Sequence, residues 1–181
     1  MEKNRLEAFS DGVLAIIITI MILELSQPAG GKPEDLFALR PVLLSYLLSF
    51  VFLAIYWVNH HLIFNLIDRV NVRILWCNIA WLFVLSFIPF ATAWVGSYSR
   101  EWAPLSFYFG DMLAAAILFH LMYYFIAQAT GKKFKMGIRN VVSLVVYLLT
   151  TLLGGFSPIA AYIAAAAVCC WWIVPERHKD I

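Results

Sequence analysis

Chemically active side chains stand at the entrance of the first apolar segment, in the stretch RLEAFSDGVLAIIITIMILEL (5–25). A carboxylate or guanidinium at the centre of a membrane helix costs about 2.5–3.5 kcal/mol on insertion scales. Asp11 lies about one and a half turns beyond Arg5, roughly 9 Å along a helix axis. Such groups persist in membranes where they pair with one another or line water. The alternative, that Ser10 and Asp11 only cap a helix at the interface, is disfavoured because the apolar periodicity starts before Asp11.

Polar side chains also occur at matching depth in the next two apolar segments. They are Trp57, Asn59, His60, His61 and Asn78. Helices joined by short turns are neighbours, so these groups should meet the polar residues of the first segment. We expect Asp11 to pair with His60 or His61. We also expect Ser10 or Arg5 to pair with one of the two asparagines.

Catalytic and metal chemistry fit this pattern poorly. Ser10, Asp11 and His60 are the residue types of a hydrolase triad, but a triad places the carboxylate behind the histidine, away from the serine. His60 and His61 are successive residues, so on a helix they point about 100° apart and do not easily share one ion. We therefore expect no enzyme, no metal site and no cofactor.

The composition indicates a membrane protein. The chain has 181 residues, of which 63% are hydrophobic and 13% charged, whereas a soluble domain is nearer half apolar and a quarter charged. A globule of this size cannot bury this much apolar surface in its interior. The solvent around it must therefore be largely lipid. The net charge of +2 without a basic, aromatic-rich patch argues against nucleic acid. Cys77, Cys169 and Cys170 lie in apolar runs without metal-ligand spacing, and we interpret them as inert.

Six segments approach the roughly 20 apolar residues that a bilayer requires. They lie near residues 6–25, 39–64, 74–95, 105–129, 138–153 and 158–174. Helix breakers such as QPAGGKP and TGKK separate them. We therefore predict an all-α, polytopic membrane protein with six transmembrane helices, forming a single domain over residues 1–181.

The distribution of cations predicts the orientation in the membrane, since cytoplasmic loops carry an excess of Lys and Arg. With six spans, one side holds ten cations: Lys3, Arg5, Arg69, Arg73, Lys132, Lys133, Lys135, Arg139, Arg177 and Lys179. The other side holds three: Lys32, Arg40 and Arg100. We expect a multi-pass protein of the cell inner (plasma) membrane with both termini in the cytoplasm.

The remainder of the first segment carries a second pattern. Ile16, Thr19, Ile20 and Leu23 follow the spacing i, i+3, i+4, i+7 and share one helical stripe. Asp11 lies about 140° away around the helix. Periodicity alone favours lipid contact or core packing for such a stripe.

Several motifs together resemble a known family. The first segment begins with R-x-x-x-F-S-D (Arg5, Phe9, Ser10 and Asp11) and continues as GVLAIIITIMILEL; WVNHH and NIAWLFVLSFIPFAT follow in the next two. This resembles the bacterial members of the transmembrane protein 175 family, the endosomal and lysosomal potassium channels. The resemblance implies a homotetramer of six-helix subunits and a non-canonical channel without a TVGYG filter loop, a string that this sequence lacks.

The resemblance also implies roles for individual residues. The first helix would line a central pore for K⁺ and other monovalent cations, with Ile16, Ile20 and Leu23 as its apolar constriction and Thr19 as the hydroxyl linked to selectivity. The motif residues would brace that helix inside its own subunit. This structural network comprises Arg5, Phe9, Ser10, Asp11, Trp57, Asn59, His60, His61 and Asn78, with the choice between the two histidines open.

Two other functions fit the residues. A proton-coupled or proton-conducting transporter would use Asp11, His60, His61, Asp111 and His120, although the first segment has no midplane glycine or proline of the kind found in broken transporter helices. A non-conducting membrane scaffold would also tolerate the apolar stripe. Glu24, near the outer end of the first segment, either concentrates cations at a pore mouth or is a plain interface residue.

Overall fold

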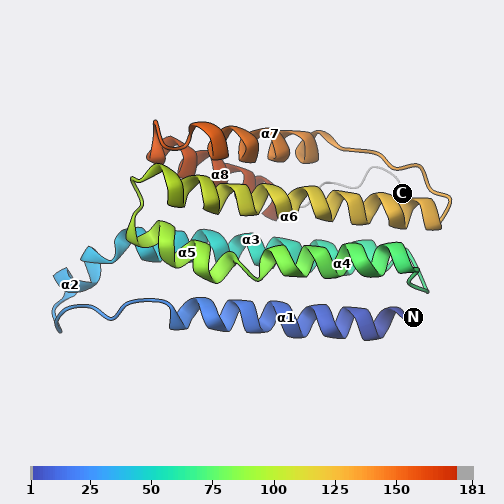
Figure 1. Cartoon of the computed structure of the whole chain (residues 1–181), viewed down its shortest axis with the longest axis horizontal. Helices are drawn as coiled ribbons and strands as arrows, with labels where there is room; N and C mark the ends of the chain where they lie inside the picture. The colour runs from blue at the N-terminus through green and yellow to red at the C-terminus, as the bar shows by residue number, and fades with distance from the viewer. Residues whose placement is uncertain (1, 175–181) are drawn as a thin grey trace.

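Long helices lying side by side make up the structure, a computed structural model that describes residues 2–174 (Figure 1). Within this range eight helices occur: α1 (Lys3–Leu23), α2 (Pro33–Ala38), α3 (Arg40–Phe64), α4 (Val72–Leu85), α5 (Ile88–Ser97), α6 (Trp102–Ala129), α7 (Ile138–Leu153) and α8 (Pro158–Ile173). The all-α prediction is confirmed. Arg177 and Lys179, which contribute to the predicted charge asymmetry, lie outside the described residues.

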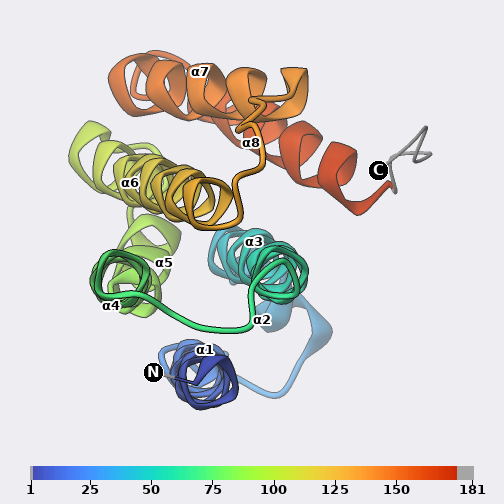
Figure 2. The same ribbon diagram turned by 90° about the vertical axis from the view of Figure 1, so that its right-hand side faces the viewer.

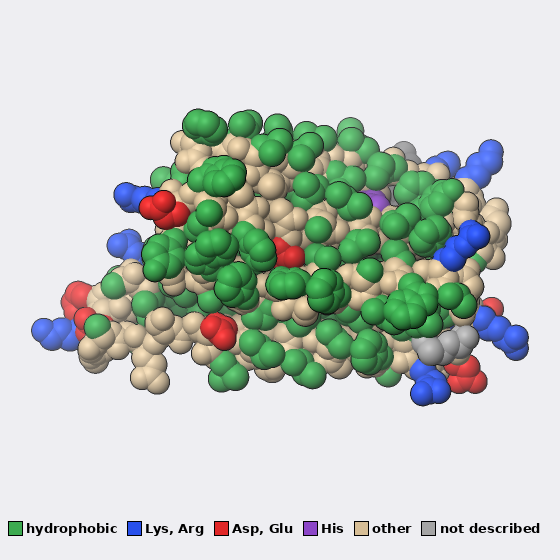
Figure 3. Space-filling model, in the orientation of Figure 1, with side chains coloured by type: hydrophobic (Ala, Val, Ile, Leu, Met, Phe, Trp, Pro, Cys, Tyr) green, Lys and Arg blue, Asp and Glu red, His purple; other side chains and the backbone are tan. Residues whose placement is uncertain are grey.

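Four helical stretches of the described chain have the length and apolar composition to cross a membrane. They are Lys3–Leu23, Arg40–Phe64, Val72–Ser97 and Trp102–Ala129. The helices α7 and α8 are apolar but have 16 residues each, about 24 Å at 1.5 Å per residue. Hydrophobic side chains cover the length of the visible face and most charged ones gather at its two ends, as Figure 3 shows.

The third apolar segment differs from the sequence prediction, because it is two helices instead of one. We expected a continuous helix over 74–95, but α4 ends at Leu85 and α5 begins at Ile88. Pro89 has no backbone N–H for the Leu85 carbonyl, and its ring crowds that carbonyl. The Ser86 hydroxyl donates to the Phe83 carbonyl at 2.6 Å and satisfies an acceptor at the break.

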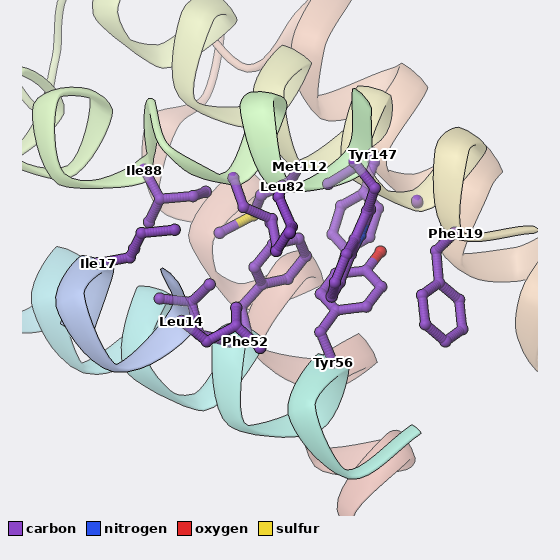
Figure 4. Close-up of a cluster of buried hydrophobic side chains, with 14 of the residues drawn as sticks. Leu14, Ile17, Phe52, Tyr56, Leu82, Ile88, Met112, Phe119 and Tyr147 are labelled. Carbon is purple, nitrogen blue, oxygen red and sulfur yellow. The ribbon is translucent and has the colours of Figure 1, made fainter. Parts of the chain in front are cut away.

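The helices form successive layers when viewed along the bundle (Figure 2). The helix α1 lies on one side, α3 with α4 and α5 lie behind it, and α6 to α8 lie farther away. The core runs through all of these layers, and Figure 4 labels side chains of α1 and of α3 to α7 within it. They are Leu14, Ile17, Phe52, Tyr56, Leu82, Ile88, Met112, Phe119 and Tyr147.

The start of α1 lies beside the turn between α3 and α4. The Lys3 ammonium donates to the Asn65 side-chain oxygen at 3.4 Å. The backbones of Glu2 and Arg69 form an isolated antiparallel β-bridge. These contacts place the N-terminal cations and the α3–α4 turn at one end of the molecule, as the predicted topology requires.

The helices α3 and α5 pack closely at Gly96, and a larger side chain there tests the fold. A Cβ atom at Gly96 would lie 2.9 Å from the Val42 Cα, a backbone atom that has little freedom to move. Gly96→Val should therefore lower the free energy of unfolding by about 1–3 kcal/mol through overpacking. Thermal unfolding of the purified protein in detergent measures the change.

The matched control is Gly110→Ala in α6, where an added Cβ would meet only the Thr151 methyl at an ordinary 3.5 Å. A Gly96 variant as stable as this control would contradict the packing of α5 on α3.

Candidate functional site

The helix α1 packs on the bundle through one narrow face. Its buried residues recur every three or four positions, which is the spacing of a single helical stripe. They are Leu6, Ser10, Leu14, Ile17 and Met21. The opposite face of α1 is exposed over most of its length, so the rest of the chain covers α1 along one side only.

A buried hydrogen-bond chain holds this face in place. His60 Nε2 donates to the Asn78 side-chain oxygen at 2.8 Å. The Asn78 amide nitrogen donates to Ser10 Oγ at 3.0 Å. The Ser10 hydroxyl in turn donates to the Leu6 carbonyl at 2.9 Å. All three side chains are buried, so the chain joins α1, α3 and α4 where no solvent competes for the bonds.

Aromatic rings fix the orientation of His60. Its imidazole stacks on Phe64 with the ring centroids 4.3 Å apart. The Trp81 indole lies nearly parallel to the imidazole, at 5.2 Å and 8°. The stacked rings point Nε2 at Asn78. His60 is thus the inward-facing histidine.

The expected pairing of Asp11 with a histidine is wrong. Trp57 Nε1 donates to the Asp11 carboxylate at 3.0 Å, and this contact is exposed. His61 turns outward, and its Nδ1 lies 3.7 Å from Oε1 of Glu7. Successive residues of a helix point about 100° apart, so the burial of His60 turns His61 away from the core.

Three further members of the predicted network do not belong to the buried hydrogen-bond chain of His60, Asn78 and Ser10. Phe9 is exposed because it precedes Ile16 by seven residues, nearly two turns, and so shares the face of the apolar stripe. Asn59 donates to the Ile55 carbonyl of its own helix at 2.7 Å. Arg5 is exposed, and no residue of the described chain forms a hydrogen bond or ion pair with its side chain.

The predicted stripe on α1 turns away from the bundle. Ile16 is 58% exposed, Ile20 40% and Leu23 80%. The Thr19 hydroxyl donates to the Ile16 carbonyl at 2.9 Å, which leaves the lone pairs of its oxygen outward. Large apolar groups and one hydroxyl oxygen therefore occupy a surface that the chain itself does not cover.

A groove of about 400 Å³ runs beside this stripe, between α1 and the α4–α5 break. Its lining is mostly apolar and includes two members of the stripe. The lining residues are Val13, Ile16, Ile17, Ile20, Glu24, Ser86, Pro89 and Phe90. Glu24 places a carboxylate at the end of the groove nearest the end of α1.

The other candidates for proton transfer lie apart from this site. Both Asp111 and His120 belong to α6. His120 Nδ1 bonds the Ala116 carbonyl of its own helix at 2.6 Å. Asp111 has one buried carboxylate oxygen without a hydrogen-bond partner among the described residues. Nine residues separate the two, so they project from opposite sides of α6.

A second polar cluster was not singled out from the sequence. Ser49 Oγ lies 2.7 Å from Thr92 Oγ1 and 2.9 Å from the Tyr108 hydroxyl, all buried. Ser45 Oγ lies 3.0 Å from the Tyr162 hydroxyl. These bonds tie α3 to α5, α6 and α8. In the sequence, the cluster is indicated only by isolated hydroxyl residues within apolar runs. Every such run contains some, so they do not mark these residues out.

Comparison with a solved structure assigns the class of protein. The crystal structure described as a lysosomal potassium-selective channel TMEM175 homolog from Chamaesiphon minutus matches with a TM-score of 0.80 and 28% identity. The match covers 94% of this chain and 96% of that one. With its apolar first helix braced from behind, the fold defines an α-helical, polytopic membrane protein of the channel class.

Sequence comparisons identify the family. The family model described as endosomal/lysosomal potassium channel TMEM175 matches residues 5–89. A potassium channel of Chryseobacterium sp. (strain P1-3) is 39% identical over 167 residues, covering 89% of this chain and 87% of that channel. The mouse endosomal/lysosomal proton channel TMEM175 is 29% identical over 113 residues, covering 56% of this chain and 23% of that protein. The chain belongs to the TMEM175 family.

The buried chain through Asn78 predicts an asymmetry between the two asparagines. Asn78→Ala should lower the free energy of unfolding by about 1–3 kcal/mol, because it leaves His60 Nε2 buried without its partner and removes the bond that Asn78 donates to Ser10. Asn59→Ala removes one bond to its own helix and should cost no more than about 0.5–1.5 kcal/mol.

Thermal unfolding in detergent, with both variants purified in parallel, compares the two. Equal destabilisation would mean that Asn78 does not carry the attachment of α1.

Proposed function

We propose that this chain forms a potassium-permeable cation channel whose central pore is lined by α1. The observation that carries the proposal is the exposed stripe of Ile16, Ile20 and Leu23 on a helix that is braced from behind. Membership of a family of channels supports a conducting role for the stripe in preference to simple lipid contact. On this account the protein is not an enzyme and uses no cofactor, and K⁺ is the permeant ion.

The stripe can gate and select through hydration. Large apolar side chains meeting around an axis exclude water, so the closed pore is a dry constriction. When the ring widens, an ion passes only after losing part of its hydration shell. We assign the narrowest ring to Ile16, with Ile20 and Leu23 forming the next rings toward the outer mouth.

Thr19 and Glu24 supply the polar groups of the proposed pore. The Thr19 hydroxyl proton is engaged by the Ile16 carbonyl, so its oxygen is oriented as an acceptor for a dehydrating cation. A ring of such oxygens would tune the preference between K⁺ and Na⁺. Glu24 near the outer end of α1 would raise the local cation concentration.

A pore lined by one helix per subunit requires several copies around an axis, and we propose a homotetramer. The groove between α1 and the α4–α5 break would receive the α1 of the neighbouring copy. Ala8, Gly12 and Ala15 lie on the exposed flank of α1 away from this groove, and small residues allow helices to approach closely. The contact is head-to-tail, the kind that closes into a ring.

The orientation follows from the cations. The starts of α1, α4 and α7, together with the α3–α4 turn and the α6–α7 loop, hold eight of the ten cations assigned to one side. We propose that this side is cytoplasmic, that both termini lie there, and that residues 1–181 form one six-span domain in the cell inner (plasma) membrane.

Proton conduction is the second candidate function. It is favoured by the name of the mouse relative, a proton channel. Among the described residues, Asp111 and His120 lie on α6 without a hydrogen-bond route to the Asp11 region. We propose that a proton current would use the same α1 pore.

Replacing the constriction should change permeation. Ile16→Ala should raise conductance and lower the preference for K⁺ over Na⁺, because a wider, wetter ring dehydrates ions less. Thr19→Ala should leave conduction in place but lower that preference. Currents across planar bilayers containing the purified protein, in K⁺ and Na⁺ solutions, measure both quantities.

The matched control is Ile22→Ala, which removes the same atoms from an exposed residue of α1 that points about 160° away from Ile20 and about 120° away from Ile16. Its currents should resemble those of the unmodified protein. Unchanged currents in the Ile16 and Thr19 variants would move the conduction path off α1.

The assembly can be weighed directly. One chain has a mass of 20.6 kDa, so the protein part of a tetramer has a mass of about 82 kDa. Native mass spectrometry of the detergent-solubilised particle should show this mass. A stable monomer would rule out a pore made by α1 from several copies.

A further inference from the structure

The loop between α6 and α7 leaves the bundle in a fixed direction. Gly131 adopts a positive φ of 66°, which a side chain would strain. The Gly131 N–H bonds the Gln128 carbonyl at 3.3 Å, and the Lys132 N–H bonds the Ala127 carbonyl at 3.1 Å. This pair of bonds is a Schellman ending, so the lysines after it follow a defined turn.

An aromatic clamp then pins the middle of the loop to α6. The Phe134 ring lies 5.3 Å from the Tyr123 ring and 5.6 Å from the Tyr124 ring, measured between centroids. The Tyr124 hydroxyl accepts a bond from Gln128 at 2.7 Å, which holds that ring in place. Phe134 faces the helix, while Lys133 and Lys135 on either side of it are exposed.

The loop presents positive charge without compensation. Lys132, Lys133 and Lys135 are all exposed, and none makes a side-chain hydrogen bond or ion pair with any residue in 2–174. Residues 112–174 contain no Asp or Glu. Arg139 is used differently, since it donates to the Val174 carbonyl at 2.9 Å and lies over the Trp171 ring at 5.6 Å.

Apolar side chains border these lysines. Met136 and Ile138 are exposed immediately beyond Lys135, and Trp171 at the end of α8 is also exposed. Lysine stems carry the ammonium groups outward from such a border, and tryptophan is enriched at the headgroup level. The loop therefore combines a cationic rim with an apolar edge, which suits a membrane interface better than open water.

We propose that the loop of residues 131–137 is a binding surface for anionic phospholipids, with Lys132, Lys133 and Lys135 meeting the headgroup phosphates. Clusters of cations beside a membrane helix attract anionic lipids by about 1 kcal/mol per lysine. The exposed Met136 and Ile138 reach the acyl region of the same leaflet. This surface is independent of the α1 pore.

Native mass spectrometry of the full chain, purified with equal phosphatidylglycerol and phosphatidylcholine, tests the proposal. The protein should retain phosphatidylglycerol preferentially at low salt. One kcal/mol corresponds to about fivefold in affinity, so Lys132→Gln with Lys133→Gln should reduce that preference at least fivefold. High salt should reduce it in the unmodified protein.

The matched control removes two exposed cations from the loops predicted to face the other side, through Lys32→Gln with Arg100→Gln. It should keep the preference for phosphatidylglycerol. Equal losses in the two double variants, or no loss in either, would overturn the proposal. So would inorganic phosphate displacing the lipid at equal concentration, since the ligand would then be a free anion.

Phe134→Ala tests whether the clamp positions the lysines, because it keeps every charge. It should lower the preference by less than the double lysine variant does. An unchanged preference would show that charge alone is sufficient and would remove Phe134 from the proposed surface.

Discussion

The position and rotation of α1 depend on the two hydrogen bonds made by the side-chain amide of Asn78. This amide accepts from His60 on α3 and donates to Ser10 on α1, so one side chain joins three helices. In a buried, low-dielectric setting an unmade bond is costly, so the helix has a single favourable rotation. Turning α1 by one residue would move Ser10 by 100° and break the chain. The apolar stripe faces outward because Ser10 faces inward.

Much of this arrangement could be predicted from the sequence. The bounds of most long helices follow from apolar run length and helix breakers, and α7 coincides with the expected segment. Ser10, His60 and Asn78 were expected to brace the first helix because polar groups at one depth need partners. The choice between His60 and His61 was not predictable. It depends on the Phe64 and Trp81 rings that enclose one imidazole, and no local pattern encodes that enclosure.

Other features were missed because they depend on tertiary contacts or on a single atom. The run 74–95 is largely apolar, and its break rests on the missing N–H of Pro89. Trp57 was named as a brace, yet its particular bond to Asp11 depends on how α1 and α3 are rotated relative to each other. The Ser49, Thr92 and Tyr108 cluster has no sequence signature, since each hydroxyl alone is ordinary in an apolar helix.

The shortness of α7 and α8 has a consequence for the surrounding lipid. At about 24 Å each, they fall roughly 6 Å short of a hydrocarbon layer near 30 Å, whereas α6, with 28 residues, exceeds it. Each ångström of hydrophobic mismatch costs a fraction of a kcal/mol, so in the proposed six-span arrangement the bilayer would thin where it meets α7 and α8. The boundary lipid around one molecule would then be unequal in thickness, and the protein would partition toward thinner membranes.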